Sequence, residues 1–175
     1  KYIIFCGVHF MAESADILSR PEQVVILPDL KAGCSMADMA NISGVERAWK
    51  EICSVSDNYL PITYINSSAD IKAFCGKNDG YVCTSSNAVD MFDYGLSNGK
   101  RVIFFPDEHL GRYAGLKLGL KEDEMIVWDP SKVFGGNNIE DIKKAKLIIW
   151  KGFCYVHLQF KAEYIDELRQ KYMGI

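Results

Sequence analysis

The sequence has few of the features that mark membrane, nucleic-acid-binding or disulfide-rich proteins. No apolar run approaches the roughly 20 residues needed to span a bilayer. Lysine and arginine are scattered along a chain of net charge −3, which gives no reason to expect a nucleic-acid or membrane partner. None of the six cysteines forms a C-x-x-C pair, and a chain of 175 residues does not need disulfides for stability. We therefore expect free thiols and a cytoplasmic location.

The composition is typical of a folded globular protein. Hydrophobic residues make up 49% of the chain and charged residues 25%, which argues against disorder. The length allows one substantial core or parts of several small domains. The chain starts at Lys1, a predicted strand follows at once, and the last predicted element is a helix. We therefore expect a fragment that lacks N- and C-terminal parts of a longer protein.

Short runs of branched apolar residues alternate with amphipathic segments along the whole chain. The runs are apolar on both faces, as in parallel sheets that helices cover on either side. The fold class predicted from this alternation is α/β, with three-layer αβα modules built on short parallel sheets. Strands are predicted at residues 2–6, 23–27, 60–65, 80–84, 101–105, 125–128 and 146–150, and helices at residues 10–19, 44–54, 68–75, 86–96, 108–118 and 161–173.

Polar residues follow several of the predicted strands. In parallel sheets ligands bind outside the carboxyl ends of the strands. Tyr64 and Asn66 are expected to project to one side because side chains alternate along a strand. Ser85 or Ser86 is predicted to cap the helix that follows, where free backbone N–H groups attract anions. The alternative is that these residues, like Asp107 after a further strand, are only helix caps.

Two cysteines lie beyond the apolar runs that precede them. Cys34 lies in KAGCSMAD and Cys154 in WKGFCYVH, each shortly after a glycine. If both loops face a common centre, both thiolates can bind one metal centre containing zinc, copper or iron–sulfur. His157, three residues after Cys154, leaves open half of a zinc site or a cysteine–histidine nucleophilic pair. The remaining cysteines, and Met36 and Met39, are interpreted as packing residues.

An ordered set of motifs resembles the quinolinate synthase family over nearly the whole chain. The set is specific, although each piece alone is not. It comprises GVHFMAESADIL, PDLKAGCSMAD, TYINSSADIKA, CTSSNA, FFPDEHLGR and WKGFCYVH, in this order.

The resemblance implies both a reaction and a cofactor. The family condenses iminoaspartate with dihydroxyacetone phosphate to give quinolinate, phosphate and water, and has a functional link to an L-aspartate-oxidising enzyme. Its three αβα domains surround a pseudo-threefold axis and a [4Fe-4S] cluster. Residues 1–40 would end the first domain, residues 41–150 would form the second, and residues 151–175 would begin the third.

The resemblance also implies roles for particular residues. Cys34 and Cys154 match two cluster ligands, and the third cysteine lies outside this chain. Tyr64, Asn66 and Ser85 match substrate-binding positions, and His157 matches an active-site histidine; Tyr64 and His157 are the expected catalytic residues. We expect these 175 residues alone to be inactive.

Two other functions are compatible with the residues. One is a metal-free αβα module that binds a small phosphorylated metabolite through helix termini. The other is an iron–sulfur hydro-lyase that acts on a different acid. Iron and sulfide content separates the first from a synthase, and product analysis separates the second.

Overall fold

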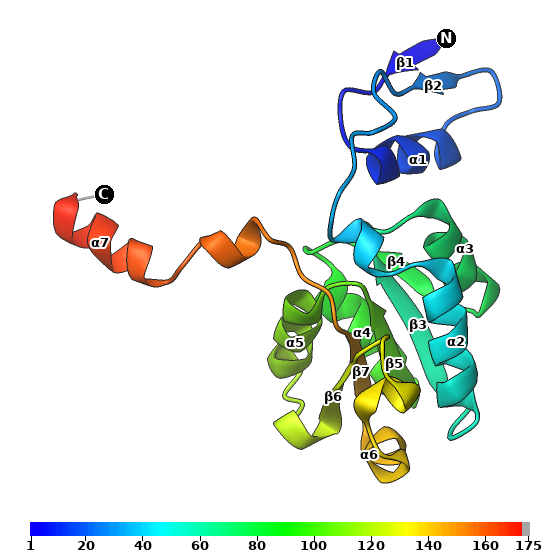
Figure 1. Ribbon diagram of the computed structural model, residues 1–175, viewed down its shortest axis with the longest axis vertical. Helices are drawn as coiled ribbons and strands as arrows, with labels where there is room; N and C mark the ends of the chain where they lie inside the picture. Colours follow the sequence, from blue (N-terminus) through cyan, green and yellow to red (C-terminus); the bar gives the residue numbers. More distant parts are fainter. Residues whose placement is uncertain (173–175) are drawn as a thin grey trace.

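The branched apolar runs form seven strands, and every strand pair is parallel. A computed structural model describes residues 1–172 and contains two sheets (Figure 1). Strands β1 (Tyr2–Ile4) and β2 (Val24–Ile26) form the smaller sheet. The larger sheet has the order β4-β3-β5-β7-β6 and consists of β3 (Tyr59–Tyr64), β4 (Tyr81–Cys83), β5 (Arg101–Phe105), β6 (Met125–Trp128) and β7 (Leu147–Trp150).

The helices alternate with the strands as predicted. Each predicted helix is present, with its ends shifted by a few residues. A further short charged helix, α6 (Ile139–Lys144), precedes β7. The predicted last helix extended to Met173, which lies outside the described residues. The other α-helices are α1 (His9–Ile17), α2 (Ile42–Cys53), α3 (Ala69–Lys77), α4 (Ala88–Ser97), α5 (Glu108–Lys117) and α7 (Glu163–Lys171).

The larger sheet is buried on both faces because successive side chains of its strands enter different cores. Ile103 and Phe105 of β5 pack in one core with residues of α2 and α3. Val102 and Phe104 of the same strand pack in a second core with residues of α4 and α5. All four side chains are fully buried. This two-sided burial confirms the predicted α/β class, with a parallel sheet between helical layers.

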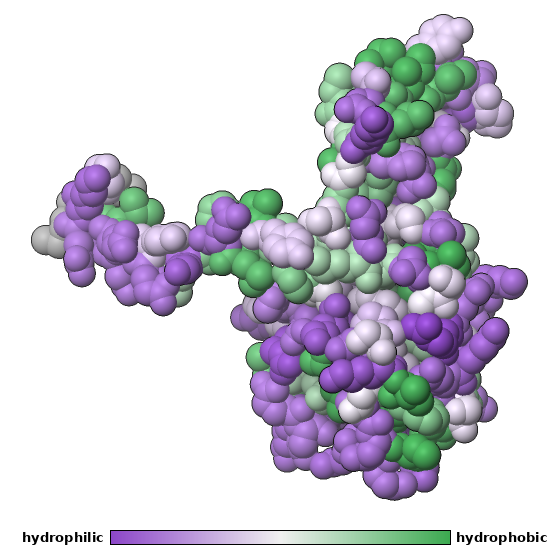
Figure 2. Space-filling model, viewed as in Figure 1, coloured by the Kyte–Doolittle hydropathy of each residue, from purple (hydrophilic) through white to green (hydrophobic). Residues whose placement is uncertain are grey.

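The smaller sheet is covered much less within the described residues. Helix α1 packs against β2, while Tyr2, Ile4 and Leu18 are exposed. Apolar surface is visible on this unit at the top of the molecule (Figure 2). Cys6 follows β1 and is exposed, so its interpretation as a buried packing residue is wrong. The reason is that a two-stranded sheet with one helix offers no second layer to bury it.

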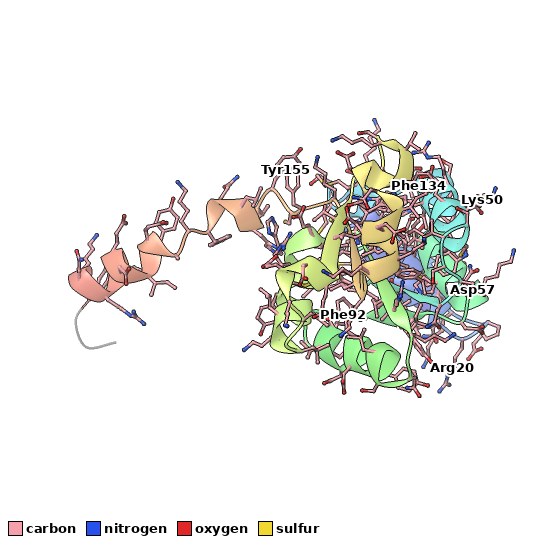
Figure 3. All side chains as sticks on the ribbon, turned by 90° about the horizontal axis from the view of Figure 1, so that it is seen from below. Arg20, Lys50, Asp57, Phe92, Phe134 and Tyr155 are labelled. Atoms are coloured by element: carbon pink, nitrogen blue, oxygen red, sulfur yellow. The ribbon has the colours of Figure 1, made fainter. Side chains whose placement is uncertain are left out.

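The chain leaves the larger sheet after β7 and ends in an extension. Residues 153–172 run away from the sheet, with Tyr155 near the start of this segment (Figures 1 and 3). The spacing of the apolar residues in this segment predicts one shared helix face, and all of them are exposed in the structure: Tyr164, Ile165 and Leu168 of α7, and Tyr172 at its C-cap. None of the helices in the described part of the chain is both long and apolar enough to cross a membrane.

Candidate functional site

Several predicted site residues lie at the carboxyl ends of the strands in the larger sheet, and the side of the sheet that these ends form is called the edge below. Tyr64 ends β3, Ser85 follows β4, Asp107 follows β5 and Cys154 follows β7. These strands are parallel neighbours, so their carboxyl ends lie side by side. The edge therefore carries a phenol, a hydroxyl, a carboxylate and a thiol.

Tyr64 is the most informative residue of this edge. Burial is the main effect that raises the pKa of its half-buried phenol, and hydrogen bonding from the Ser85 side chain acts in the opposite direction. The negative charges of Asp107, Cys83 and Cys34 raise the pKa further. The phenol of Tyr64 therefore stays protonated at neutral pH. A protonated phenol can donate a hydrogen bond to a carboxylate or carbonyl oxygen.

Asn66 lies in a bend rather than on the strand. Because β3 ends at Tyr64, the argument that strand alternation aligns Tyr64 with Asn66 is wrong. The bend is held instead by buried hydroxyl groups. Ser67 Oγ donates to the Tyr64 carbonyl at 2.8 Å, and Thr63 Oγ1 donates to Ser67 Oγ at 2.9 Å. Both hydroxyl-bearing residues are fully buried, so the half-buried Asn66 sits on a fixed turn.

Ser85 does not cap the helix that follows it. The N-cap of α4 is Asn87, so the prediction of Ser85 or Ser86 at this position is wrong. Asn87 Oδ1 accepts from the Thr84 N–H at 2.7 Å, and this contact tightens the turn between β4 and α4. Ser85 is exposed, and its hydroxyl is not the cap of α4. Sequence reasoning could not separate three successive cap-forming residues.

The loops that carry Cys34 and Cys154 have the same backbone hydrogen bonds. The Cys34 carbonyl accepts from the N–H of Asp38 at 3.1 Å, and the Cys154 carbonyl accepts from that of Leu158 at 3.2 Å. In each loop a short 3-10 helix follows, over Ala37–Met39 and His157–Gln159. Each cysteine therefore begins the same local structure, and both thiols are half-exposed.

The two cysteine loops are also anchored in the same way. The carbonyl two residues before each cysteine accepts from the first N–H of a helix. For Cys34 the bond joins Ala32 O and His9 N at 2.7 Å, and for Cys154 it joins Gly152 O and Glu108 N at 2.7 Å. The glycines noted in the sequence do not correspond: Gly33 precedes Cys34 directly, whereas Gly152 matches Ala32. The equivalence lies in the backbone and not in the glycine pattern.

Met39 joins the two cysteine loops. Its sulfur accepts from the Phe153 N–H at 3.2 Å, and its carbonyl accepts from Trp150 Nε1 at 2.9 Å. Residues next to Cys154 are thus in direct contact with the segment that follows Cys34. Met39 was interpreted from sequence as a packing residue only, and no sequence signal indicated this contact. The fold thus puts the two cysteine loops in contact, and the common metal centre stays a prediction.

Gly152 is required by the close approach of the Cys154 loop to the end of β5. A Cβ atom at this position would lie 2.1 Å from the Pro106 carbonyl oxygen and 3.3 Å from Met39 Cβ. We expect Gly152→Ala to destabilise the full-length protein by roughly 1–3 kcal/mol through overpacking, measured by urea denaturation. Gly76→Ala is the control, because a Cβ there would meet nothing within 4 Å. Equal stability of the two variants would contradict this requirement.

His157 lies apart from this edge in the described structure. Its side chain is exposed at the first residue of the short helix after Cys154. Within residues 1–172 its side chain makes no hydrogen bond or ion pair, so the structure shows no contact between His157 and Cys154. The alternative of half a zinc site finds no further ligands in the described part of the chain. Residues 1–172 contain no group of three or more His, Cys, Asp or Glu that could hold a metal ion.

The residues present fit two ligands of a thiolate-bound metal centre. Cys34 lines a hollow of about 310 Å³ together with His9 and Asp38, so its sulfur can be approached from solvent. Cys75 and Cys83 provide a contrast, because burial raises the pKa of Cys83 to about 12 and that of Cys75 still further. Thiolates are the ligands of metals and clusters. Cys34 and Cys154 are partly exposed and occupy matching positions in their loops, so they are the suitable pair.

The fold and this edge define a class of protein: an α/β protein with equivalent cysteine loops at the carboxyl ends of parallel strands. A family model described as quinolinate synthetase A protein (NadA) matches residues 1–175. The chain belongs to this family.

Curated relatives named quinolinate synthase support the assignment. Identity is 52% over 178 residues with the Acidobacterium capsulatum protein, and the alignment covers 100% of this chain and 48% of the relative. The corresponding values are 53% over 184 residues, 100% and 47% for a Nocardioides protein, and 50% over 175 residues, 99% and 44% for that of Corynebacterium glutamicum. The chain thus spans about half the length of these relatives.

Proposed function

We propose that the complete protein is a cytoplasmic quinolinate synthase that condenses iminoaspartate with dihydroxyacetone phosphate, releasing phosphate and water. The observation that carries the proposal is the pair of equivalent cysteine loops, which are joined through Met39 in a chain of this family. Cys34 and Cys154 would provide two ligands of a [4Fe-4S] cluster, with a third cysteine from the rest of the protein. When bound, such a cluster supplies Lewis-acid chemistry at an iron that no thiolate occupies.

The other side chains of the edge are assigned to binding and orientation. We assign the Tyr64 phenol, the Asn66 amide and the Ser85 hydroxyl to the carboxylates of the substrate and product. Burial keeps the phenol protonated and therefore a donor. The turn at Ser67 fixes Asn66 relative to Tyr64. Asp107 is nearly fully buried and accepts from the Leu110 N–H at 2.7 Å, so it holds the start of α5 beside the Cys154 loop.

In this proposal His157 acts together with a part of the complete protein that this chain does not contain. Residues 151–175 would begin a third domain, after residues 1–40 of the first and residues 41–150 of the second. The exposed apolar face of α7 supports this division, because such a face is normally buried against a further layer. We assign His157 to the active site that this layer would complete. A functional link to an L-aspartate-oxidising enzyme would supply iminoaspartate, whose imine hydrolyses readily in water.

Anaerobic product analysis tests the proposed reaction. The full-length protein, incubated with iminoaspartate and dihydroxyacetone phosphate, is expected to form quinolinate and inorganic phosphate in equal amounts. Liquid chromatography with mass spectrometry and a phosphate assay measure the two products. Iron and sulfide are expected near four each per chain, as an Fe₄S₄ centre requires.

Two results would replace this proposal by another function. A protein free of iron and sulfide that binds a phosphorylated metabolite is a binding module. A protein that holds the cluster, forms no quinolinate and dehydrates another acid is a hydro-lyase.

A further inference from the structure

The turn that carries Asn66 is backed by a lysine from the following helix. Lys72 Nζ donates to the Ser67 carbonyl at 2.6 Å. Lys72 is half-buried, and burial lowers the pKa of its amine while the Glu13 carboxylate raises it. Burial thus disfavours the charged form of the amine, and the Glu13 carboxylate favours it. Its hydrogen bond ties the turn to α3 at the residue next to Asn66.

The partners of Lys72 come from the other sheet unit. Its ammonium group lies 5.5 Å from the centre of the Phe10 ring, and Phe10 belongs to α1. Glu13, also on α1, accepts from the Ala69 N–H at 3.0 Å through Oε2. This contact replaces a side-chain cap, since Ser68 at the N-cap of α3 makes no cap hydrogen bond. Helix α1 thus holds both the start of α3 and the lysine that supports the turn.

We infer that Lys72, whose ammonium group lies over the Phe10 ring of α1 and donates to the Ser67 carbonyl, is a positioning residue that fixes the Asn66 turn and so sets the affinity of the site for a dicarboxylate. The inference rests on the proposed function for the identity of the ligand, but the positioning itself rests on the contacts alone. Lys72 does not touch the reacting atoms in this assignment. It acts through Ser67, whose hydroxyl holds Tyr64 and whose carbonyl accepts from the lysine.

The surroundings of Lys72 allow its amine to be removed without opening a cavity. Its side chain lines an apolar hollow of about 550 Å³ together with Ile17, Leu18 and Val82. Methionine is of similar length and suits irregular apolar surroundings. Lys72→Met therefore removes the charge and the donor while it keeps the aliphatic packing. Lys77→Met on the same helix is the matched control, because Lys77 is exposed and makes no side-chain hydrogen bond within residues 1–172.

The test compares Lys72→Met, Lys72→Arg and Lys77→Met in the full-length protein. Losing a hydrogen bond from a charged group that supports the site is expected to weaken quinolinate binding about tenfold or more, measured by isothermal titration calorimetry. Hydrogen exchange at residues 65–68 is expected to accelerate in Lys72→Met and to stay at the wild-type rate in Lys77→Met. Arginine keeps the charge and the donor, so Lys72→Arg is expected to recover most of the affinity.

Two outcomes separate this inference from the proposed function. Wild-type exchange rates at residues 65–68 in Lys72→Met, with quinolinate affinity equal to that of Lys77→Met, would overturn the positioning role. If the wild-type protein neither binds nor forms quinolinate, the proposed function fails and the stated ligand with it. Accelerated exchange confined to Lys72→Met would still support the positioning of the turn.

Discussion

Cys34→Ser in the complete protein is expected to lose both the iron–sulfur cluster and all measurable quinolinate formation. Serine removes the thiolate that an iron–sulfur cluster requires, while the backbone of the loop can remain, because its hydrogen bonds come from main-chain groups. The loop and the Met39 contact to the Cys154 segment therefore stay in place. The measurements are iron and sulfide content, the visible absorption of the anaerobic protein, and the rate of quinolinate formation.

Cys53→Ser is the control for this experiment. Cys53 is also half-buried, but it ends α2 on the opposite side of the domain from the cysteine loops, and burial raises the pKa of its thiol. We expect it to keep both the cluster and the activity. Iron and sulfide contents that are equal in the two variants would remove Cys34 from the ligand set. A loss in both variants would show that cysteine replacement acts through stability instead.

Tyr64→Phe is expected to lower turnover about 100-fold while the cluster content stays unchanged. A donor preorganised toward a developing charge contributes an effect of about this size in other enzymes. The phenol suits this role because burial raises its pKa and keeps its proton, and because Tyr64 ends β3 at the carboxyl edge of the sheet. The ring itself remains in phenylalanine, so packing at the end of β3 is preserved. Steady-state kinetics with iron quantification in the same preparation measures the effect.

A second tyrosine shows whether the effect is specific to the site. Tyr113→Phe is the matched control. Tyr113 is 52% exposed and lies in the middle of α5, away from the end of the helix that adjoins β5. We expect its kinetics to equal those of the wild type. Unchanged turnover in Tyr64→Phe would remove Tyr64 from the site, whatever the role of the cysteines.

The strands of the sheet were predictable from sequence because local composition and burial agree there. Branched residues on both faces of the run at Arg101–Phe105 indicated a strand covered on two sides, and both cores are present. The same reasoning failed at Cys6, which the sequence presented as another apolar strand end. Its exposure depends on how many layers cover the smaller sheet, and no single strand carries that information.

The candidate site was predictable only as a set of residues at strand ends. The position of Asn66 in a bend, and of Asn87 instead of Ser85 at the helix N-cap, depends on where each strand and helix ends by a residue or two. Several neighbouring residues can cap a helix equally well, so local preference does not choose between them. Asp107 caps α5 through a contact within its own turn, as the sequence allowed. Met39 and Lys72 act through contacts with distant segments and carried no local signal of that role.

The sequence by itself determined the parallel α/β plan and set Cys34 and Cys154 apart from the packing cysteines. Both results follow from local pattern, because a branched run indicates a strand and a packing cysteine is expected within such a run and not beyond its end. Only the tertiary structure decided that the two loops share one backbone arrangement and meet at Met39. Such contacts join residues far apart in the chain, and their formation depends on the packing of the whole sheet and not on any segment alone.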